Sequence, residues 1–230
     1  MSVLGFVQAG GGSTRFGADK ALVQFEGKTL LARTVELVAS VCDETQIVAL
    51  PGKYVDASAA ILADQWPGQG PLGGILTALH YTNERLGVSA GTRDAEGRPR
   101  NYALILSCDM PFLTHDWLAY LCDRAIKSTA QVIVPESENG WEPLCACWRT
   151  DGAATIQAAF DAGVRKVTEA MKRLPREVLD ESAWKRFDTD GRLFWNMNTP
   201  ADYEEACRVF KERAGPFGRT QVKQARPLQG

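Results

Sequence analysis

The chain has 230 residues, of which 45% are hydrophobic and 23% are charged, an ordinary composition for a soluble globular protein. Its 26 lysines and arginines and 28 aspartates and glutamates give a net charge of -2, which provides no basic field for nucleic acid. No segment approaches the roughly 20 apolar residues of a membrane span, and the first residues do not resemble a signal peptide. We therefore expect a cytoplasmic protein that binds neither nucleic acid nor a membrane.

Short apolar runs alternate with segments of helical periodicity along the chain. Helices are expected over residues 30–41 and 72–86. The alternation predicts an α/β fold of three layers, in which helices cover both faces of a mostly parallel sheet. Ligands bind such sheets at the carboxyl ends of the strands. The predicted strands cover residues 3–7, 46–50, 61–62, 102–107 and 131–134.

Two polar segments lie outside this pattern. Residues 87–101 are rich in glycine and arginine and predict a flexible surface loop, with a lid carrying Arg93, Arg98 or Arg100 as the alternative. Residues 214–230 contain few apolar side chains, and we expect them to be disordered. The remainder, residues 1–213, is expected to form a single domain.

A glycine-rich segment follows the first predicted strand directly. Residues 9–20 read AGGGSTRFGADK, so the backbone can approach a ligand closely and direct its N–H groups at phosphate oxygens. Arg15 and Lys20 add two positive charges. A Walker A loop is excluded, because Ala18 stands where that motif needs its lysine. The segment is typical of a nucleoside triphosphate site, with a plain structural loop as the alternative.

Two carboxylates follow later strands. Asp64 opens a turn-rich segment that leads into the helix expected from about Leu72. Asp109 follows the strand that ends at Ser107, and Thr114 is a better cap than Asp109 for the next helix. Asp109 is therefore a candidate ligand for Mg²⁺, although an Asp after a strand is more often a cap or turn residue.

The six cysteines are scattered inside apolar runs without a C-x-x-C pair, and only two histidines could join them in a zinc site. Free cysteine is among the most buried residue types, so we expect small buried side chains rather than a metal site. The cysteines are Cys42, Cys108, Cys122, Cys145, Cys147 and Cys207.

Six motifs in order resemble those of the molybdenum cofactor guanylyltransferases (MobA type), which are nucleotidyltransferases with a Rossmann-like fold. The resemblance extends from about residue 3 to residue 206. The motifs are A-G-G-x-S-x-R-x-G-x-D-K at 9–20, G-P-L-x-G at 70–74, C-D-x-P-F at 108–112, an E-P-L-x-A strand at 142–146, A-G-x-R-K-V at 162–167 and N-x-N-T-P at 196–200.

The resemblance implies roles for individual residues on the nucleotide side. Asp109 would hold Mg²⁺, and Arg15 and Lys20 would act with it in catalysis. The implied guanine nucleotide contacts are Gln8, Ala9, Gly10, Gly11, Lys20, Asp64 and Asp109.

On the pterin side, the resemblance implies four binding residues, namely Arg165, Lys166, Asn196 and Asn198. Each has a simpler alternative. The first two could form a charged helix start, and the asparagines could cap the helix expected near Pro200, as could Thr199.

The chain departs from the family pattern at three places. Gln8 replaces the usual apolar residue, Phe16 replaces a methionine, and residues 49–52, Ala-Leu-Pro-Gly, replace a segment that often carries asparagine. Guanine preference would persist if the base is recognised by the backbone of the first loop.

The implied reaction joins GMP from GTP to the terminal phosphate of molybdopterin and releases pyrophosphate. A phosphate nucleophile needs little deprotonation near neutral pH, so no catalytic triad is required. Implied partners are GTP, molybdopterin, and cofactor-synthesis or molybdoenzyme-maturation proteins. Cytidylyl transfer, nucleotidyl transfer to a sugar phosphate, and nucleotide binding without turnover are the alternatives.

Overall fold

The computed structural model describes residues 2–9, 19–25, 27–54, 57–87 and 101–214. An eight-stranded sheet forms its centre, with strand order β10-β7-β9-β6-β1-β4-β5 and β8 paired to β7. The strands are β1 (Val3–Gln8), β4 (Glu44–Ala49), β5 (Ala60–Ala63), β6 (Tyr102–Ser107), β7 (Val132–Ser137), β8 (Gly140–Trp141), β9 (Cys145–Arg149) and β10 (Arg176–Leu179), and a separate hairpin joins β2 (Gln24–Phe25) to β3 (Lys28–Thr29).

Helices connect these strands. The α-helices are α1 (Leu30–Ala39), α2 (Pro71–Leu86), α3 (His115–Lys127), α4 (Ala153–Asp161), α5 (Val167–Met171), α6 (Glu181–Trp184) and α7 (Pro200–Ala214). Three 3₁₀ turns are η1 (Lys20–Leu22), η2 (Thr150–Gly152) and η3 (Lys185–Phe187). None of the helices within the described residues is long and apolar enough to cross a lipid bilayer.

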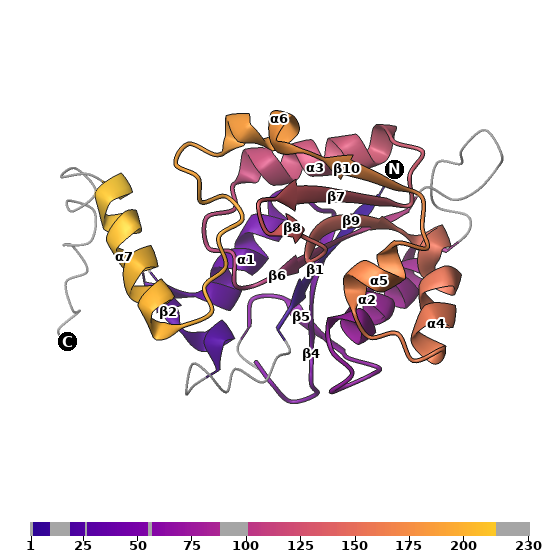
Figure 1. Ribbon diagram of the computed structural model, residues 1–230. Helices are drawn as coiled ribbons and strands as arrows, with labels where there is room; N and C mark the ends of the chain where they lie inside the picture. The colour runs from indigo at the N-terminus through magenta and orange to yellow at the C-terminus, as the bar shows by residue number, and fades with distance from the viewer. Residues whose placement is uncertain (1, 10–18, 26, 55–56, 88–100, 215–230) are drawn as a thin grey trace.

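The helices cover both faces of the sheet, as Figure 1 shows. One buried cluster joins α1, α3 and α6 to one face, and a second joins α2, α4 and α5 to the other. Strands β1 and β6 lie between the two clusters and are buried along almost their whole length. The predicted three-layer fold with a mostly parallel sheet is confirmed.

Helix α1 lies so close to β1 that a side chain at Gly5 would overlap Val38 Cγ1. This close approach explains a glycine among the apolar residues of β1.

Strands β1, β4, β5 and β6 are parallel neighbours, so their carboxyl ends meet at one end of the sheet. Strand β9 is antiparallel to β6 and β7. It begins at Cys145, which corrects the strand expected from Glu142, because Pro143 has no N–H for a ladder and Cys145 N instead closes a turn on Glu142 O at 2.9 Å.

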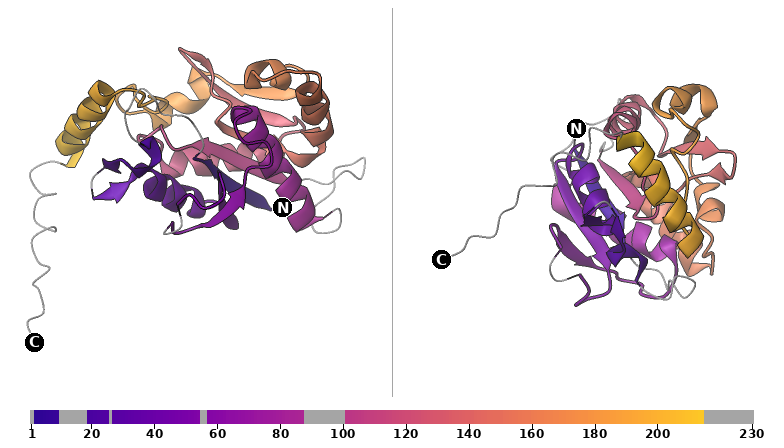
Figure 2. Two further views of the ribbon diagram at one scale, coloured as in Figure 1. Left: turned by 90° about the horizontal axis from the view of Figure 1, so that it is seen from below. Right: turned by 90° about the vertical axis from the view of Figure 1, so that its left-hand side faces the viewer.

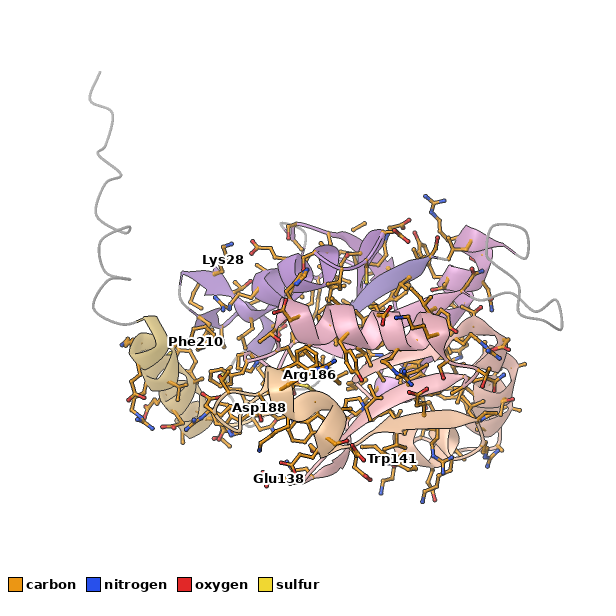
Figure 3. The ribbon with its side chains drawn as sticks, turned by 90° about the horizontal axis from the view of Figure 1, so that it is seen from above. Lys28, Glu138, Trp141, Arg186, Asp188 and Phe210 are labelled. Atoms are coloured by element: carbon orange, nitrogen blue, oxygen red, sulfur yellow. The ribbon has the colours of Figure 1, made fainter. Side chains whose placement is uncertain are left out.

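Helix α7 packs on the β2–β3 hairpin beside the sheet (Figure 2). Phe210 of α7 is stacked on Phe112, with ring centroids 5.2 Å apart, and meets Phe25 of β2 edge-on at 4.6 Å. Phe210 and Lys28 of the neighbouring β3 are labelled in Figure 3. This aromatic contact holds the C-terminal helix next to the segment that follows β6.

Most predicted elements agree with the structure, and the strand over 102–107 agrees at both ends. Four of the six cysteines are buried, as expected, while Cys42 and Cys207 are half-buried. The predicted loop over 87–101 falls almost wholly outside the described residues, as does the predicted disordered tail.

Candidate active site

The site lies at the carboxyl ends of β1 and β6. Gln8, the last residue of β1, pairs in register with Ser107, the last residue of β6. Asp109 follows two residues later, in the turn before Pro111. The carboxyl ends of the parallel strands therefore bring Ala9, which directly follows β1, and the predicted metal ligand Asp109 to the same region.

Asp109 is fixed by contacts on both its side chain and its backbone. Ser107 Oγ donates a hydrogen bond to Asp109 Oδ1 at 2.6 Å. Met197 N donates to the Asp109 carbonyl at 2.8 Å, which ties the segment before α7 to the end of β6. Thr114 caps α3 through Trp117 N, as the sequence predicted, so Asp109 is not used as the helix cap.

Lys20 connects three distant parts of the chain. Its Nζ donates to Asp109 Oδ2 at 3.1 Å and to Asn198 Oδ1 at 3.1 Å. Its side chain is only 12% exposed. The structure thus brings together three of the predicted site residues, with one ammonium between two oxygen atoms.

Asn198 is available for this contact because its neighbours cap α7. Thr199 Oγ1 accepts from Asp202 N at 3.1 Å, and Asp202 Oδ2 accepts from Asn198 N and Thr199 N at 2.7 Å each. The cap is therefore Thr199. Asn196 makes only a local side-chain contact, to Phe194 O at 3.2 Å, among the described residues.

The other nucleotide-side residues line the same end of the sheet. Gln8 Nε2 donates to Pro71 O at the start of α2, and the Ala9 carbonyl lies 2.9 Å from the Tyr54 hydroxyl. Asp64 follows β5, where its Oδ1 accepts from Trp66 N. The same oxygen accepts from the Thr77 hydroxyl of α2 at 3.2 Å. Asp64 therefore also shapes its own turn.

Arg165 and Lys166 lie on the α4–α5 side. Arg165 donates to Gln69 Oε1 and Phe160 O, and its guanidinium lies 4.0 Å from the Phe160 ring centroid. Lys166 is the exposed N-cap position of α5. Within the described residues, no hydrogen bond joins this pair to the predicted asparagines. The remaining predicted residues, Gly10, Gly11 and Arg15, lie outside the described residues.

Sequence reasoning missed an acidic group behind the site. Glu142 is 8% exposed and accepts a hydrogen bond from Ser137 Oγ at 2.7 Å. Burial raises the pKa of Glu142 and the negative charge of Asp109 raises it further, while the Ser137 bond acts in the opposite direction. The E-P-L motif indicated a strand here and gave no reason to expect a buried carboxyl group beside the site.

Three other residues were missed near Lys20. Asp19, Lys53 and Tyr54 form a cluster in which Asp19 Oδ2 accepts from Lys53 Nζ at 3.0 Å and from the Tyr54 hydroxyl at 2.8 Å. Asp19 could have been found as the acidic half of the Asp-Lys pair. Nothing in the sequence pattern singles out Tyr54.

A cavity of about 440 Å³ opens next to the segment that carries Asn196 and Asn198. It lies between the β7–β8 hairpin, α6 and residues 188–195, and its lining includes Ser137 and Trp195. Glu138 and Asp188, which also line it, are labelled in Figure 3. Five acidic residues and one lysine line the cavity, and none of Lys20, Asp109 and Asn198 is among its lining residues.

Cys108 does not supply a nucleophile, although it precedes Asp109. Burial raises the pKa of its thiol to about 12, and the neighbouring Asp109 charge adds to this effect. The thiol is therefore protonated near neutral pH, and chemistry at this site depends on its charged and amide groups.

The fold and the charged cluster at its strand ends define a nucleotidyltransferase-like α/β protein. The family model described as the MobA-like NTP transferase domain matches residues 5–176. The chain belongs to this family.

Individual relatives agree with this assignment. A molybdenum cofactor guanylyltransferase of Desulfosudis oleivorans is 32% identical, over 91% of this chain and 96% of its own. The crystal structure of molybdopterin-guanine dinucleotide biosynthesis protein A from Archaeoglobus fulgidus has the same fold, with a TM-score of 0.74, 24% identity and coverage of 91% of this chain and 99% of its own. The crystal structure of 2-C-methyl-D-erythritol 4-phosphate cytidylyltransferase from Thermus thermophilus also has a similar fold, with a TM-score of 0.61, 14% identity and coverage of 92% of this chain and 98% of its own.

Proposed function

We propose that the chain transfers GMP from GTP to the terminal phosphate of molybdopterin and releases pyrophosphate. The observation that carries the proposal is the convergence of Lys20, Asp109 and Asn198 at the strand ends, within a chain 32% identical to a molybdenum cofactor guanylyltransferase. Two phosphate groups must approach each other in this reaction, so a site with a lysine ammonium and oxygen ligands for a divalent cation suits it.

The donor atoms of the cluster fit Mg²⁺. Asp109 Oδ2 and Asn198 Oδ1 are hard oxygen ligands, and both already lie 3.1 Å from one cationic nitrogen. When bound there, Mg²⁺ would neutralise phosphate oxygens and stabilise the charge on departing pyrophosphate. Ser107 would orient Asp109 for this role through its 2.6 Å hydrogen bond to the other carboxylate oxygen.

Lys20 would then act on the triphosphate. Its ammonium can turn from the two oxygens to a phosphate group, where it offsets the negative charge that opposes attack. Arg15 and the N–H groups of Gly10 and Gly11 would add to this neutralisation. Gln8, Ala9 and Asp64 would contact the nucleotide from the ends of β1 and β5.

The acceptor phosphate would bind at the segment that carries Asn196 and Asn198, because Asn198 Oδ1 already contacts the Lys20 ammonium at 3.1 Å. The 440 Å³ cavity is a poor site for an anion, because its lining includes five acidic residues and one lysine. Both asparagines would then orient the acceptor phosphate. Arg165 and Lys166, on the α4–α5 side, would contact its more distant atoms. Proteins that make or receive the cofactor would be the partners.

The test is pyrophosphate release from each nucleoside triphosphate with molybdopterin and Mg²⁺. We expect release that requires both GTP and molybdopterin, and its nearly complete loss in Asp109→Asn. Asp123→Asn is the matched control, because Asp123 forms an exposed pair with Lys127 on α3. Preference for CTP would instead indicate a cytidylyltransferase, and GTP binding without release would indicate a binding protein.

A further inference from the structure

Tyr54 has a strained backbone conformation close to the site. Its φ is 56°, and it is the one residue other than glycine with positive φ within the described parts of the chain. Tyr54 directly follows a turn over residues 50–53 that contains Gly52 and is closed by a hydrogen bond from Lys53 N to Leu50 O at 3.2 Å. A side chain in this conformation costs energy and persists where surrounding contacts enforce it, often at functional sites.

The contacts of the Tyr54 hydroxyl account for this conformation. The hydroxyl lies 2.8 Å from Asp19 Oδ2 and 2.9 Å from the Ala9 carbonyl. These two residues come immediately before and after the segment 10–18. Lys53 donates to the same Asp19 oxygen at 3.0 Å. The turn thus directs two consecutive side chains at one carboxylate.

Asp19 links the Tyr54 hydroxyl to the turn that begins at Lys20. Its other oxygen, Oδ1, accepts from Ala21 N at 3.1 Å and so caps η1, the turn that begins at Lys20. Burial raises the pKa of Asp19, but hydrogen bonds from Lys53, Tyr54 and Ala21 outweigh burial and lower the pKa overall. The carboxylate therefore stays ionised and accepts all three bonds near neutral pH.

We propose that Tyr54 is a positioning residue that holds Lys20 at Asp109 and Asn198 by fixing Asp19. Its role in turnover rests on the proposed function of Lys20, whereas its effect on the position of Lys20 does not. The contacts of the hydroxyl with Asp19 and Ala9 would in turn help to hold Tyr54 in its strained conformation.

Tyr54→Phe removes the hydroxyl and keeps the ring that packs against the core. Tyr81→Phe is the matched control, because Tyr81 also donates to a carboxylate, Glu44 Oε1 at 2.6 Å, at the opposite end of β4. Each variant loses one charge-assisted hydrogen bond, so the two should unfold at similarly lowered temperatures. A difference between the two variants in the reactivity of Lys20 then reports on the position of its side chain rather than on the stability of the fold.

The first measurement is the acetylation rate of Lys20 by acetic anhydride, followed by mass spectrometry. Lys20 is 12% exposed, while the internal references Lys28 and Lys127 are 52% and 63% exposed. Tyr54→Phe should raise the Lys20 rate several-fold relative to these references, and Tyr81→Phe should leave it unchanged. An unchanged rate in Tyr54→Phe overturns the proposal whatever reaction the protein catalyses.

The second measurement is a double-mutant cycle on pyrophosphate release. Tyr54→Phe should lower kcat about tenfold, the effect of losing one hydrogen bond to a charged group. Added to Lys20→Met, it should change kcat by less than about twofold, because its effect passes through Lys20. If the double variant instead lowers kcat by the product of the two single effects, the coupling between Tyr54 and Lys20 is refuted. If the wild-type chain releases no pyrophosphate, the proposed function fails while the acetylation result still decides the position of Lys20.

Discussion

Lys20→Met should have opposite effects on metal binding and on turnover. Methionine keeps much of the length of the side chain but removes the ammonium that lies 3.1 Å from Asp109 Oδ2 and 3.1 Å from Asn198 Oδ1. If Asp109 and Asn198 hold Mg²⁺ as proposed, that ammonium would compete with the metal for the same two oxygens in the protein without nucleotide. A single positive charge and a divalent cation 4 Å apart repel by about 8 kcal/mol at an effective dielectric constant of 20.

The variant should therefore bind Mg²⁺ more tightly when nucleotide is absent. Because the lysine can also turn away, we expect only part of the repulsion to be recovered, a gain of about 1.4 kcal/mol or roughly tenfold in affinity. Turnover should move the other way, falling roughly 10²- to 10³-fold, as is typical when one electrostatic donor to a transition state is lost.

Calorimetric titration with Mg²⁺ and an assay of pyrophosphate release measure the two effects separately. Lys127→Met is the control, since Lys127 pairs with Asp123 on α3 and is 63% exposed. Weaker Mg²⁺ binding in Lys20→Met would show that the two oxygens are not the metal ligands. Turnover within about threefold of wild type would refute the role of Lys20 in charge neutralisation.

Gly5→Ala should lower the free energy of unfolding by about 1–3 kcal/mol, because the new Cβ overlaps Val38, and urea titration should show a smaller loss on a Val38→Ala background. Burial and the negative charge of Asp109 raise the pKa of Glu142 in the folded state above its ordinary 4.5. The free energy of unfolding therefore falls as the pH rises from the pKa of the unfolded chain to that of the folded chain. Glu142→Gln should abolish this fall in urea titrations made at increasing pH above 4.5, and an unchanged slope would contradict the prediction. A chain that ends at Ala214 should keep its melting temperature and turnover; loss of either would show that residues 215–230 are needed.

The fold could be predicted because its signals are local. Each buried strand is a short apolar run, and the alternation with helices specifies a parallel sheet. The position of Asp109 followed from the same pattern, since the strand before it ends at Ser107 as predicted. The antiparallel β9 was less clear, because a run of buried residues does not reveal strand direction.

The contacts that complete the site have no local signal. Lys20 meets Asp109 and Asn198 across 89 and 178 residues of sequence, and only the packing of α7 brings the last segment there. Tyr54 was equally hidden, because nothing in its sequence neighbourhood indicates positive φ for a tyrosine. Glu142 lies in a recognised motif, but its burial depends on the β7–β8 hairpin that folds over it.

The two acidic groups explain why a lysine occupies the centre of the site. Asp109 and the buried Glu142 interact closely enough for one charge to raise the pKa of the other. The Lys20 ammonium offsets this repulsion before any substrate binds, and neutral Asn198 adds an acceptor without adding charge. Arrival of a metal-bound triphosphate would supply the compensating positive charge at Asp109 and release Lys20 towards the phosphates. The lysine can therefore stabilise the resting site and the reacting one in turn, provided that its backbone is held in place, as Asp19 and Tyr54 do.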